Sequence, residues 1–456
     1  MTAAPRRVGI GVDFGTTNSS VALFDGKNTV PVDFPLEDSD IVPSAIYFQR
    51  GRLARPILGS DAVDTYIREN ENRVVQLSQE DLGELQMFVA DQTFTFQIHA
   101  LTDKDLPGRL FRSLKRWLGD RTIESIPIFQ KRVPTVALIT PILSHLALAF
   151  GLTDEDRVYM GRPVRFGGDD EIAQERLGKS AAEADYKDIV FYPEPVAAAV
   201  SYLRNKAVSA DGTYLCFDFG GGTLDLCVLD ASGGEFAVRS THGIPLGGDL
   251  IDQLIYKRKL FPELGDGCPL TMECMDGSKK TYRFRLYQYE EGLLNWQLAY
   301  RLQQPDLMAP VAKNLKLEGE TGLKFWRLHT IIRRNYSYRV LRAIEEAKIR
   351  LSDNTQTTIE IPELKLSVPI KRSEFDTYLK DYLEEIDECV RTALDDAEAS
   401  PSDICGVVCT GGSSRIPVVQ AHLTNTLGQP VEEHDVFSGV AAGLAIADYH
   451  GYPSPL

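Results

Sequence analysis

Two short segments of the chain combine an aspartate, a glycine-rich tip and hydroxyl side chains in the same order. Residues 8–25 read VGIGVDFGTTNSSVALFD, and residues 214–230 read YLCFDFGGGTLDLCVLD. Each contains Asp-Phe-Gly between two apolar runs, with Asp13 in the first segment and Asp218 in the second. Such a tip offers backbone N–H groups and hydroxyls to phosphate, and its aspartate can hold the water around a metal ion. The repeat predicts a metal–phosphate site built from one structural unit used twice.

The two tips differ in how they would bind phosphate. In the first, a glycine that permits positive φ and close approach is followed by two threonines and an asparagine. In the second, three consecutive glycines between strands cost backbone entropy, which indicates that the backbone must lie against a ligand. The tip residues are Gly15, Thr16, Thr17 and Asn18, and then Gly220, Gly221, Gly222, Thr223 and Asp225.

Two further glycine pairs come directly before predicted helices. Gly247 and Gly248 open one helix, and residues 410–417, TGGSSRIP, link a buried strand to another. Because the first N–H groups of a helix have no partner within it, a helix start with small residues can bind an anion. Each pair alone is a weak signal, since strand–glycine–helix turns are common in α/β folds.

The elements that position these residues can be read from apolar periodicity. Hairpins are expected at 6–25 and 213–230, with a local hairpin at 87–98. Helices are expected where apolar residues recur with helical spacing. These are residues 106–118, 134–152, 169–184, 195–204, 331–352, 373–398 and 438–448.

Strand hairpins and helical crossovers occur twice, which indicates an α/β protein with two lobes around a cleft. We expect lobe I to span residues 1–212 and lobe II residues 213–435, with a C-terminal helix at 436–456 packing back on lobe I. Ligands of such sheets bind where the loops converge at the strand ends.

Composition narrows the classes of function. The 456 residues carry a formal net charge of −16, which argues against a protein that coats nucleic acid. The longest apolar stretch, 133–152, is interrupted by prolines and polar residues, so we expect no membrane span. The N-terminus leads straight into the first strand without a signal peptide. Seven cysteines without a CxxC pair indicate reduced thiols in a cytoplasmic protein.

Six motifs in order make the chain resemble the nucleotide-binding domain of the DnaK-type heat-shock chaperones, the heat shock protein 70 family. They are GVDFGTTNSSVA, SLKRWLG, YPEPVAAAVSYL, FDFGGGTLDL with PLGGDLID, EEAKIRLS and TGGSSRIPVV. The resemblance implies a two-lobed actin-like ATPase fold, with duplicated ribonuclease-H-like domains around a central nucleotide cleft. It also implies ATP or ADP with Mg²⁺ as cofactor, and K⁺ as a further candidate cation.

The resemblance assigns roles at matching positions. Asp13 and Asp218 would hold Mg²⁺ through water. Lys115 would position the attacking water and the γ-phosphate, and Glu194 is the acid at the same site. Asp218, Thr223 and Asp225 would complete the catalytic face. The nucleotide would be bound by Gly15, Thr16, Thr17, Asn18, Gly220, Gly221, Gly222, Gly247, Gly248, Glu345, Lys348, Ser352, Gly411, Gly412, Ser413 and Arg415.

The sequence also departs from the family. Pro163 matches the proline that relays nucleotide state, but the family pattern continues there with smaller residues. No linker and peptide-binding sandwich follow Asp448, so the chain resembles the short YegD-like branch, an isolated nucleotide-binding domain. Residues 50–112 and 253–330 do not match the family closely, and we expect a partner protein to bind there.

We therefore expect a chaperone-like protein with slow Mg²⁺-dependent ATP hydrolysis. Its expected partners are adenine nucleotide and unfolded clients or co-chaperones, with neither nucleic acid nor membrane. The alternative is a nucleotide-dependent structural or regulatory protein, such as an actin-like filament or a nucleotide-state sensor with little turnover. A small-molecule kinase is a third reading, for which no sugar-binding loop can be identified.

Overall fold

The structure is a computed structural model that describes residues 8–34, 37, 39–89, 92–205, 211–233, 235–273, 276–429, 431–433 and 439–455. Residues 80–89, 92–100, 205, 273 and 432–433 are described by their backbone alone. Contacts divide the chain into two compact units. Unit 1 comprises Met1–Thr65, Arg109–Ile251 and Leu379–Leu456, and unit 2 comprises Tyr66–Gly108 and Asp252–Tyr378.

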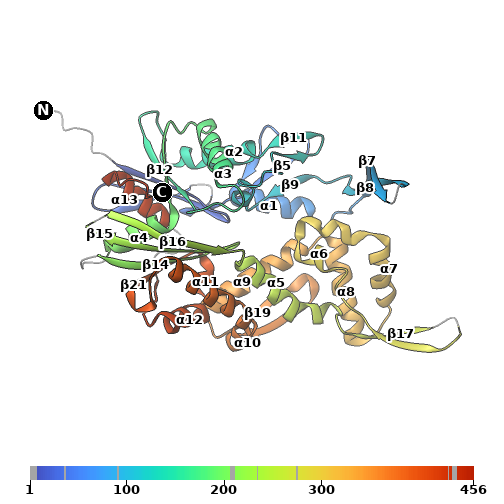
Figure 1. Cartoon of the computed structure of the whole chain (residues 1–456). Coiled ribbons are helices and arrows are strands. Elements are labelled where there is room, and N and C mark those ends of the chain that lie inside the picture. The colour runs from blue at the N-terminus through green and yellow to red at the C-terminus, as the bar shows by residue number, and fades with distance from the viewer. Residues whose placement is uncertain are drawn as a thin grey trace. The chain divides into compact units, whose positions relative to one another are not determined.

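Unit 1 contains a first sheet with strand order β13-β12-β1-β2-β3, of which β12 is labelled in Figure 1. Strands β1, β2 and β3 form an antiparallel meander, while β12 runs parallel to β1 and β13 parallel to β12. A short strand, β4, also pairs with β2. Their bounds are β1 Gly9–Phe14, β2 Asn18–Phe24, β3 Thr29–Pro31, β4 Ile41–Pro43, β12 Arg157–Arg162 and β13 Asp188–Pro193.

A second sheet in the same unit repeats this arrangement, with strand order β16-β15-β14-β21-β22. Its first three strands are again an antiparallel meander, followed by two parallel strands. The bounds are β14 Gly212–Phe219, β15 Leu224–Ser232, β16 Glu235–Ile244, β21 Ile404–Thr410 and β22 Val431–Glu433. The expected hairpins and the mixed α/β class are confirmed, and the repeat extends from the tips to the whole strand order.

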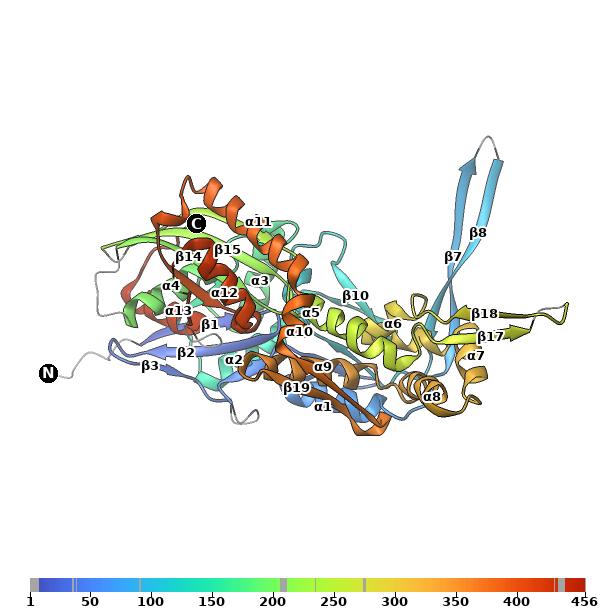
Figure 2. The same cartoon turned by 90° about the horizontal axis from the view of Figure 1, so that it is seen from below.

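The helices of unit 1 cover these sheets. Helix α4 packs on β14 and β21, whereas α13 packs on β1, β2 and β12, and the two helices pack on each other (Figure 2). Gly9 and Gly11 permit the close approach of α13, because a Cβ at either would lie 2.1 or 2.2 Å from a carbonyl oxygen of that helix. The helices are α2 Val136–Phe150, α3 Asp170–Glu183, α4 Glu194–Asn205, α11 Lys380–Asp396, α12 Pro417–Leu427 and α13 Gly439–His450.

Three expected helices differ from the structure. The helix at 106–118 is wrong: the chain there forms strand β9, Gly108–Phe111, and a 3₁₀ turn, Leu114–Trp117. The helix at 331–352 is instead the end of α8, Gly319–Arg334, and α9, Ser337–Asp353. Asn335 separates them in the left-handed conformation at φ 57°. The helix at 373–398 is likewise two, α10 Arg372–Tyr378 and α11.

The remaining elements of unit 1 are small sheets and one helix start. Strands β5 Ile46–Gln49, β6 Ile57–Leu58 and β9 form one sheet, and β10 Ser125–Ile128 pairs with β11 Lys131–Pro134. Helix α1, Gly59–Asn70, begins in unit 1, as does α5, Gly248–Ile255. Cysteines 216, 227, 268, 389 and 409 are buried and free, Cys405 is exposed and free, and Cys274 lies outside the described residues.

Unit 2 contains helices α6 to α10 and three hairpins. Besides α8, α9 and α10, its helices are α6 Glu290–Leu294 and α7 Pro305–Asn314. The hairpins pair β7 Leu77–Val89 with β8 Gln92–Asp103, β17 Pro269–Glu273 with β18 Lys279–Arg283, and β19 Gln356–Ile361 with β20 Leu366–Lys371. The hairpin expected at 87–98 is therefore confirmed and is longer than expected, and its tip at 90–91 lies outside the described residues.

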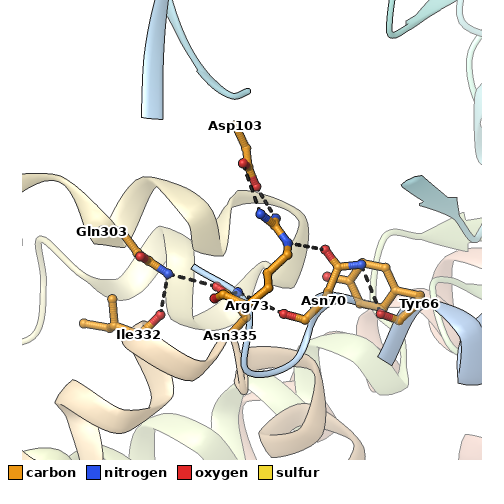
Figure 3. Close-up of polar contacts among 7 residues, drawn as sticks. All are labelled: Tyr66, Asn70, Arg73, Asp103, Gln303, Ile332 and Asn335. Atoms are coloured by element: carbon orange, nitrogen blue, oxygen red, sulfur yellow. Dashed lines mark hydrogen bonds and ion pairs between the residues drawn. The ribbon is translucent and has the colours of Figure 1, made fainter. Parts of the chain in front are cut away.

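Polar contacts fix the base of the β7–β8 hairpin in unit 2 (Figure 3). The guanidinium of Arg73 forms an ion pair with Asp103. Asp103 is the last residue of β8 and pairs with Leu77, the first residue of β7. The amide of Asn335 donates to the carbonyl oxygens of Asn70 at 2.9 Å and of Arg73 at 3.2 Å. The amide of Gln303 donates to Asn335 at 3.0 Å. The break between α8 and α9 thus anchors the hairpin.

Candidate functional site

The two repeated aspartates lie at the ends of the first strands of the two sheets. Asp13 lies one residue before the end of β1 and pairs with Ser20 of β2. Asp218 lies one residue before the end of β14 and pairs with Asp225 of β15, with Thr410 of β21 on its other side. Both aspartates are in unit 1. The strand repeat therefore places the two carboxylates at equivalent positions, as the sequence alignment predicts.

Lys115 and Glu194 form a buried ion pair beside these aspartates. Lys115 lies in the 3₁₀ turn, and its side chain is only 7% exposed. Its Nζ donates to Oε1 of Glu194, the first residue of α4. Burial lowers the pKa of Lys115, but the carboxylates of Glu194 and Asp13 outweigh burial and raise it overall. The lysine is therefore held in its charged form.

The aspartates themselves are protonated more readily than usual. Burial, with help from the charge of Glu194, raises the pKa of Asp13 to about 8. Burial, followed by the charges of Asp225 and Glu194, raises the pKa of Asp218 to about 7. One lysine thus faces four carboxyl groups, so the site lacks positive charge.

A divalent cation would supply the positive charge that this site lacks. Mg²⁺ binds few protein carboxylates and keeps much of its water, so two aspartates at neighbouring strand ends suit it. Among the described residues, no group of three or more His, Cys, Asp or Glu side chains is arranged to hold a metal directly. Binding through water at Asp13 and Asp218 stays a prediction.

The glycine elements are joined around the second tip. The N–H of Gly248 donates to the carbonyl of Gly220 at 3.0 Å, and the N–H of Asp249 donates to Gly221 at 2.8 Å. The hydroxyl of Ser413 donates to the carbonyl of Gly220 at 3.0 Å. Thr223 donates its hydroxyl to Asp225 at 2.7 Å, and burial raises the pKa of Asp225. Three glycine segments that are far apart in sequence are therefore brought together.

Two glycines are required by close approach. A Cβ at Gly221 would lie 2.7 Å from the Thr17 hydroxyl, so the two tips are in contact. Gly411 adopts φ 76°, and a Cβ there would lie 2.7 Å from a carboxylate oxygen of Asp218. The positive φ expected at Gly15 is wrong, because Gly15 is not among the glycines with positive φ. Gly15 instead lies close to the backbone of Asn18, because a Cβ at position 15 would be 2.2 Å from the Asn18 carbonyl oxygen.

Sequence reasoning missed three contributors. The Arg116 guanidinium occupies the space where a Cβ of Gly222 would be, and it lies 3.4 Å from Asp249. Ser44 donates its hydroxyl to the Gly15 carbonyl at 2.8 Å and supports the first tip. Thr410 hydrogen-bonds Asp218 and so opposes the rise of its pKa. Arg116 and Thr410 lie inside the motifs SLKRWLG and TGGSSRIP, next to residues that the sequence analysis assigned a role.

The residues assigned to the nucleoside are not all in one unit. Glu345, Lys348 and Ser352 lie on α9 in unit 2, where Lys348 forms an ion pair with Asp252 at 2.8 Å. Gly412 and Arg415 lie in a 3₁₀ turn of unit 1. Pro163 follows β12, and its carbonyl accepts a hydrogen bond from Arg162. The roles predicted for these residues remain predictions.

The model of the Hsp70 protein family matches residues 188–261 and 331–447. These segments contain Glu194, the second tip, Gly247 and Gly248, the α9 residues and residues 411–415, whereas the first tip and Lys115 lie outside them. The match supports a nucleotide-binding, chaperone-type protein, and this family implies an actin-like ATPase fold that binds ATP or ADP with Mg²⁺. Within the part of the chain that the structure describes, every helix is too short or too polar to span a bilayer.

Proposed function

We propose that this chain binds Mg²⁺–ATP at the Lys115 cluster and hydrolyses it slowly, as a chaperone-like protein. The observation that carries the proposal is the buried pair of Lys115 and Glu194 beside two repeated aspartates, with glycine tips around them. Phosphoryl transfer to water needs positioning and neutralisation of charge more than covalent chemistry. This site offers fixed charge and backbone N–H groups for both.

Each residue has a role that follows from its surroundings. The Lys115 ammonium, kept charged by its carboxylate neighbours, would stabilise negative charge on the γ-phosphate and hold the attacking water. Glu194 orients that ammonium through their hydrogen bond. Asp225 has a raised pKa and is fixed by Thr223, so it is suited to accept the proton that the water loses. When bound, Mg²⁺ would neutralise charge on the phosphates, with Asp13 and Asp218 holding its water.

The finer assignments belong to the same proposal. Residues 345, 348 and 352 would bind ribose and adenine, and residues 411–415 would close over the nucleoside. The family match supports both, since it covers these residues. We also propose that the chain has two lobes, 1–212 and 213–435, with duplicated ribonuclease-H-like cores, and that it belongs to the short YegD-like branch. Its proposed location is the cytoplasm, and its proposed partners are unfolded clients or co-chaperones.

Phosphate release by the purified chain tests the proposal. We expect slow release that requires Mg²⁺, and we expect Lys115→Ala to abolish it while ATP still binds. Lys179→Ala, at an exposed lysine on α3, is the matched control and should keep the wild-type rate. Unchanged turnover in Lys115→Ala would remove this lysine from the mechanism. ATP binding without any release in the wild type would favour the nucleotide-state sensor instead.

A further inference from the structure

A pocket of unit 1 that shares no residue with the aspartate cluster has a strongly positive lining. The turn between β5 and β6 and the turn between β10 and β11 enclose a hollow of about 1140 Å³. Its lining includes four cationic side chains, Arg50, Arg52, Arg55 and Lys131. The other residues of the lining, all of them described, include neither Asp nor Glu. In a chain of net charge −16, such a group of cations is a local exception.

The floor of this basic pocket is apolar. Leu53, Ile57 and Phe129 line it and are half-buried, whereas the four cationic residues are exposed. The Arg50 guanidinium lies 4.6 Å from the centre of the Phe129 ring. An anionic ligand with an apolar part would therefore meet both kinds of surface. A simple inorganic anion would leave most of the volume and the apolar floor uncovered.

Phe129 gives a second, independent observation. It is the first of two residues in the β10–β11 turn, where Ile128 pairs with Lys131. Its φ is 55°, in the left-handed region where such a turn commonly has glycine. A bulky side chain in this conformation costs free energy, and residues of this kind cluster at ligand-binding sites. The ring lines the pocket and also packs against the hydrophobic core, so it is held there against the preference of the turn.

We propose that the basic pocket binds an acidic, extended polypeptide segment that carries a large apolar side chain. The cations would pair with its carboxylates, and the apolar residue would lie on Phe129, Leu53 and Ile57. At physiological ionic strength the screening length is about 8 Å, so the local positive charge dominates over the distant negative charge of the chain. A nucleic acid would contact a longer surface and meet that net negative charge.

The test is fluorescence anisotropy of the full chain with a short labelled peptide of glutamate and phenylalanine. We expect binding that weakens as salt is added. The double variant Arg52→Glu/Arg55→Glu should bind about tenfold more weakly, because each reversal replaces an attraction with a repulsion. The matched control, Lys27→Glu/Lys179→Glu, makes the same change of charge at exposed lysines elsewhere in unit 1 and should bind normally.

Several results would overturn the proposal. The first is equal peptide binding by the Arg52/Arg55 variant and the control variant. The second is binding of an all-glutamate peptide as tight as that of the glutamate–phenylalanine peptide. The third is displacement of the labelled peptide by inorganic phosphate or a DNA oligonucleotide as effectively as by the unlabelled peptide. Phe129→Gly removes a ring that lines the pocket and also packs against the hydrophobic core, and it relieves the turn. We expect weaker peptide binding, measured at a temperature at which the variant is folded. Unchanged binding by the folded variant would show that Phe129 serves only the fold.

Discussion

Replacing Asp13 by asparagine should stabilise the nucleotide-free protein at alkaline pH. Folding buries this carboxyl and raises its pKa from 3.8 to about 8. A group whose pKa is higher in the folded state stabilises the fold fully below its unfolded pKa. That contribution is lost as pH rises through the folded pKa. Asp13 should therefore make the wild type progressively less stable between about pH 4 and pH 8.

The size of the effect follows from the two pKa values. At about 1.36 kcal/mol for each unit, the raised pKa of Asp13 costs the fold about 5 kcal/mol at pH 8 and less than about 2 kcal/mol at pH 5. Asparagine has nearly the same shape and does not titrate. The stability gained by Asp13→Asn should therefore grow by about 3 kcal/mol between these two pH values.

Urea unfolding in the presence of EDTA, at several pH values, measures this difference. Asp33→Asn is a suitable control, because Asp33 is exposed in the same unit. The sign should reverse when Mg²⁺ and ADP are added, since only the wild type would gain the full stabilisation by the ligand. An Asp13→Asn protein that is less stable at pH 8 without ligand would refute the reasoning, as would a pH slope equal to that of the wild type.

Three other substitutions test separate parts of the account. Asp218→Asn should weaken ADP binding in Mg²⁺ about tenfold or more but change binding in EDTA little; equal losses in both titrations would contradict a metal role. Gly411→Ala should lower stability by about 1–3 kcal/mol in urea unfolding, because of its positive φ and its contact with Asp218; unchanged stability would show that the loop adapts. Arg73→Ala should leave buried Asp103 without its ion-pair partner and cost about 3 kcal/mol, whereas Arg73→Lys should cost less. Hydrogen exchange at the base of β7–β8 should rise in Arg73→Ala, and unchanged exchange would mean that Asn335 alone holds the hairpin.

The repeated tips could be predicted because local sequence specifies them. In both places an apolar run, Asp-Phe-Gly and a second apolar run form a hairpin, and the shared offset of Asp13 and Asp218 predicted their equivalent positions. The strand order of the sheets could not be read in this way, since it depends on pairing between β1 and β12 and between β14 and β21. Those pairs are formed by segments far apart in the chain.

Other features could not be predicted from the sequence, for identifiable physical reasons. Residues 106–118 have a helical pattern, but pairing of β9 with β5 and the left-handed Ser113 override it. The break at Asn335 depends on hydrogen bonds to Asn70 and Arg73, which no local pattern reveals. Arg116 follows Lys115 directly, yet only the fold brings its guanidinium against Gly222. Tertiary contacts decide each of these cases.

The most direct measurement is calorimetric titration of the wild type and of Asp13→Asn with ADP, each with Mg²⁺ and with EDTA. If the buried carboxylates and Lys115 form a nucleotide site, the wild type binds one ADP per chain, far more tightly with Mg²⁺, and the variant loses that difference. If the folded wild type gives no binding heat, or binds equally with Mg²⁺ and with EDTA, the site is not what we propose.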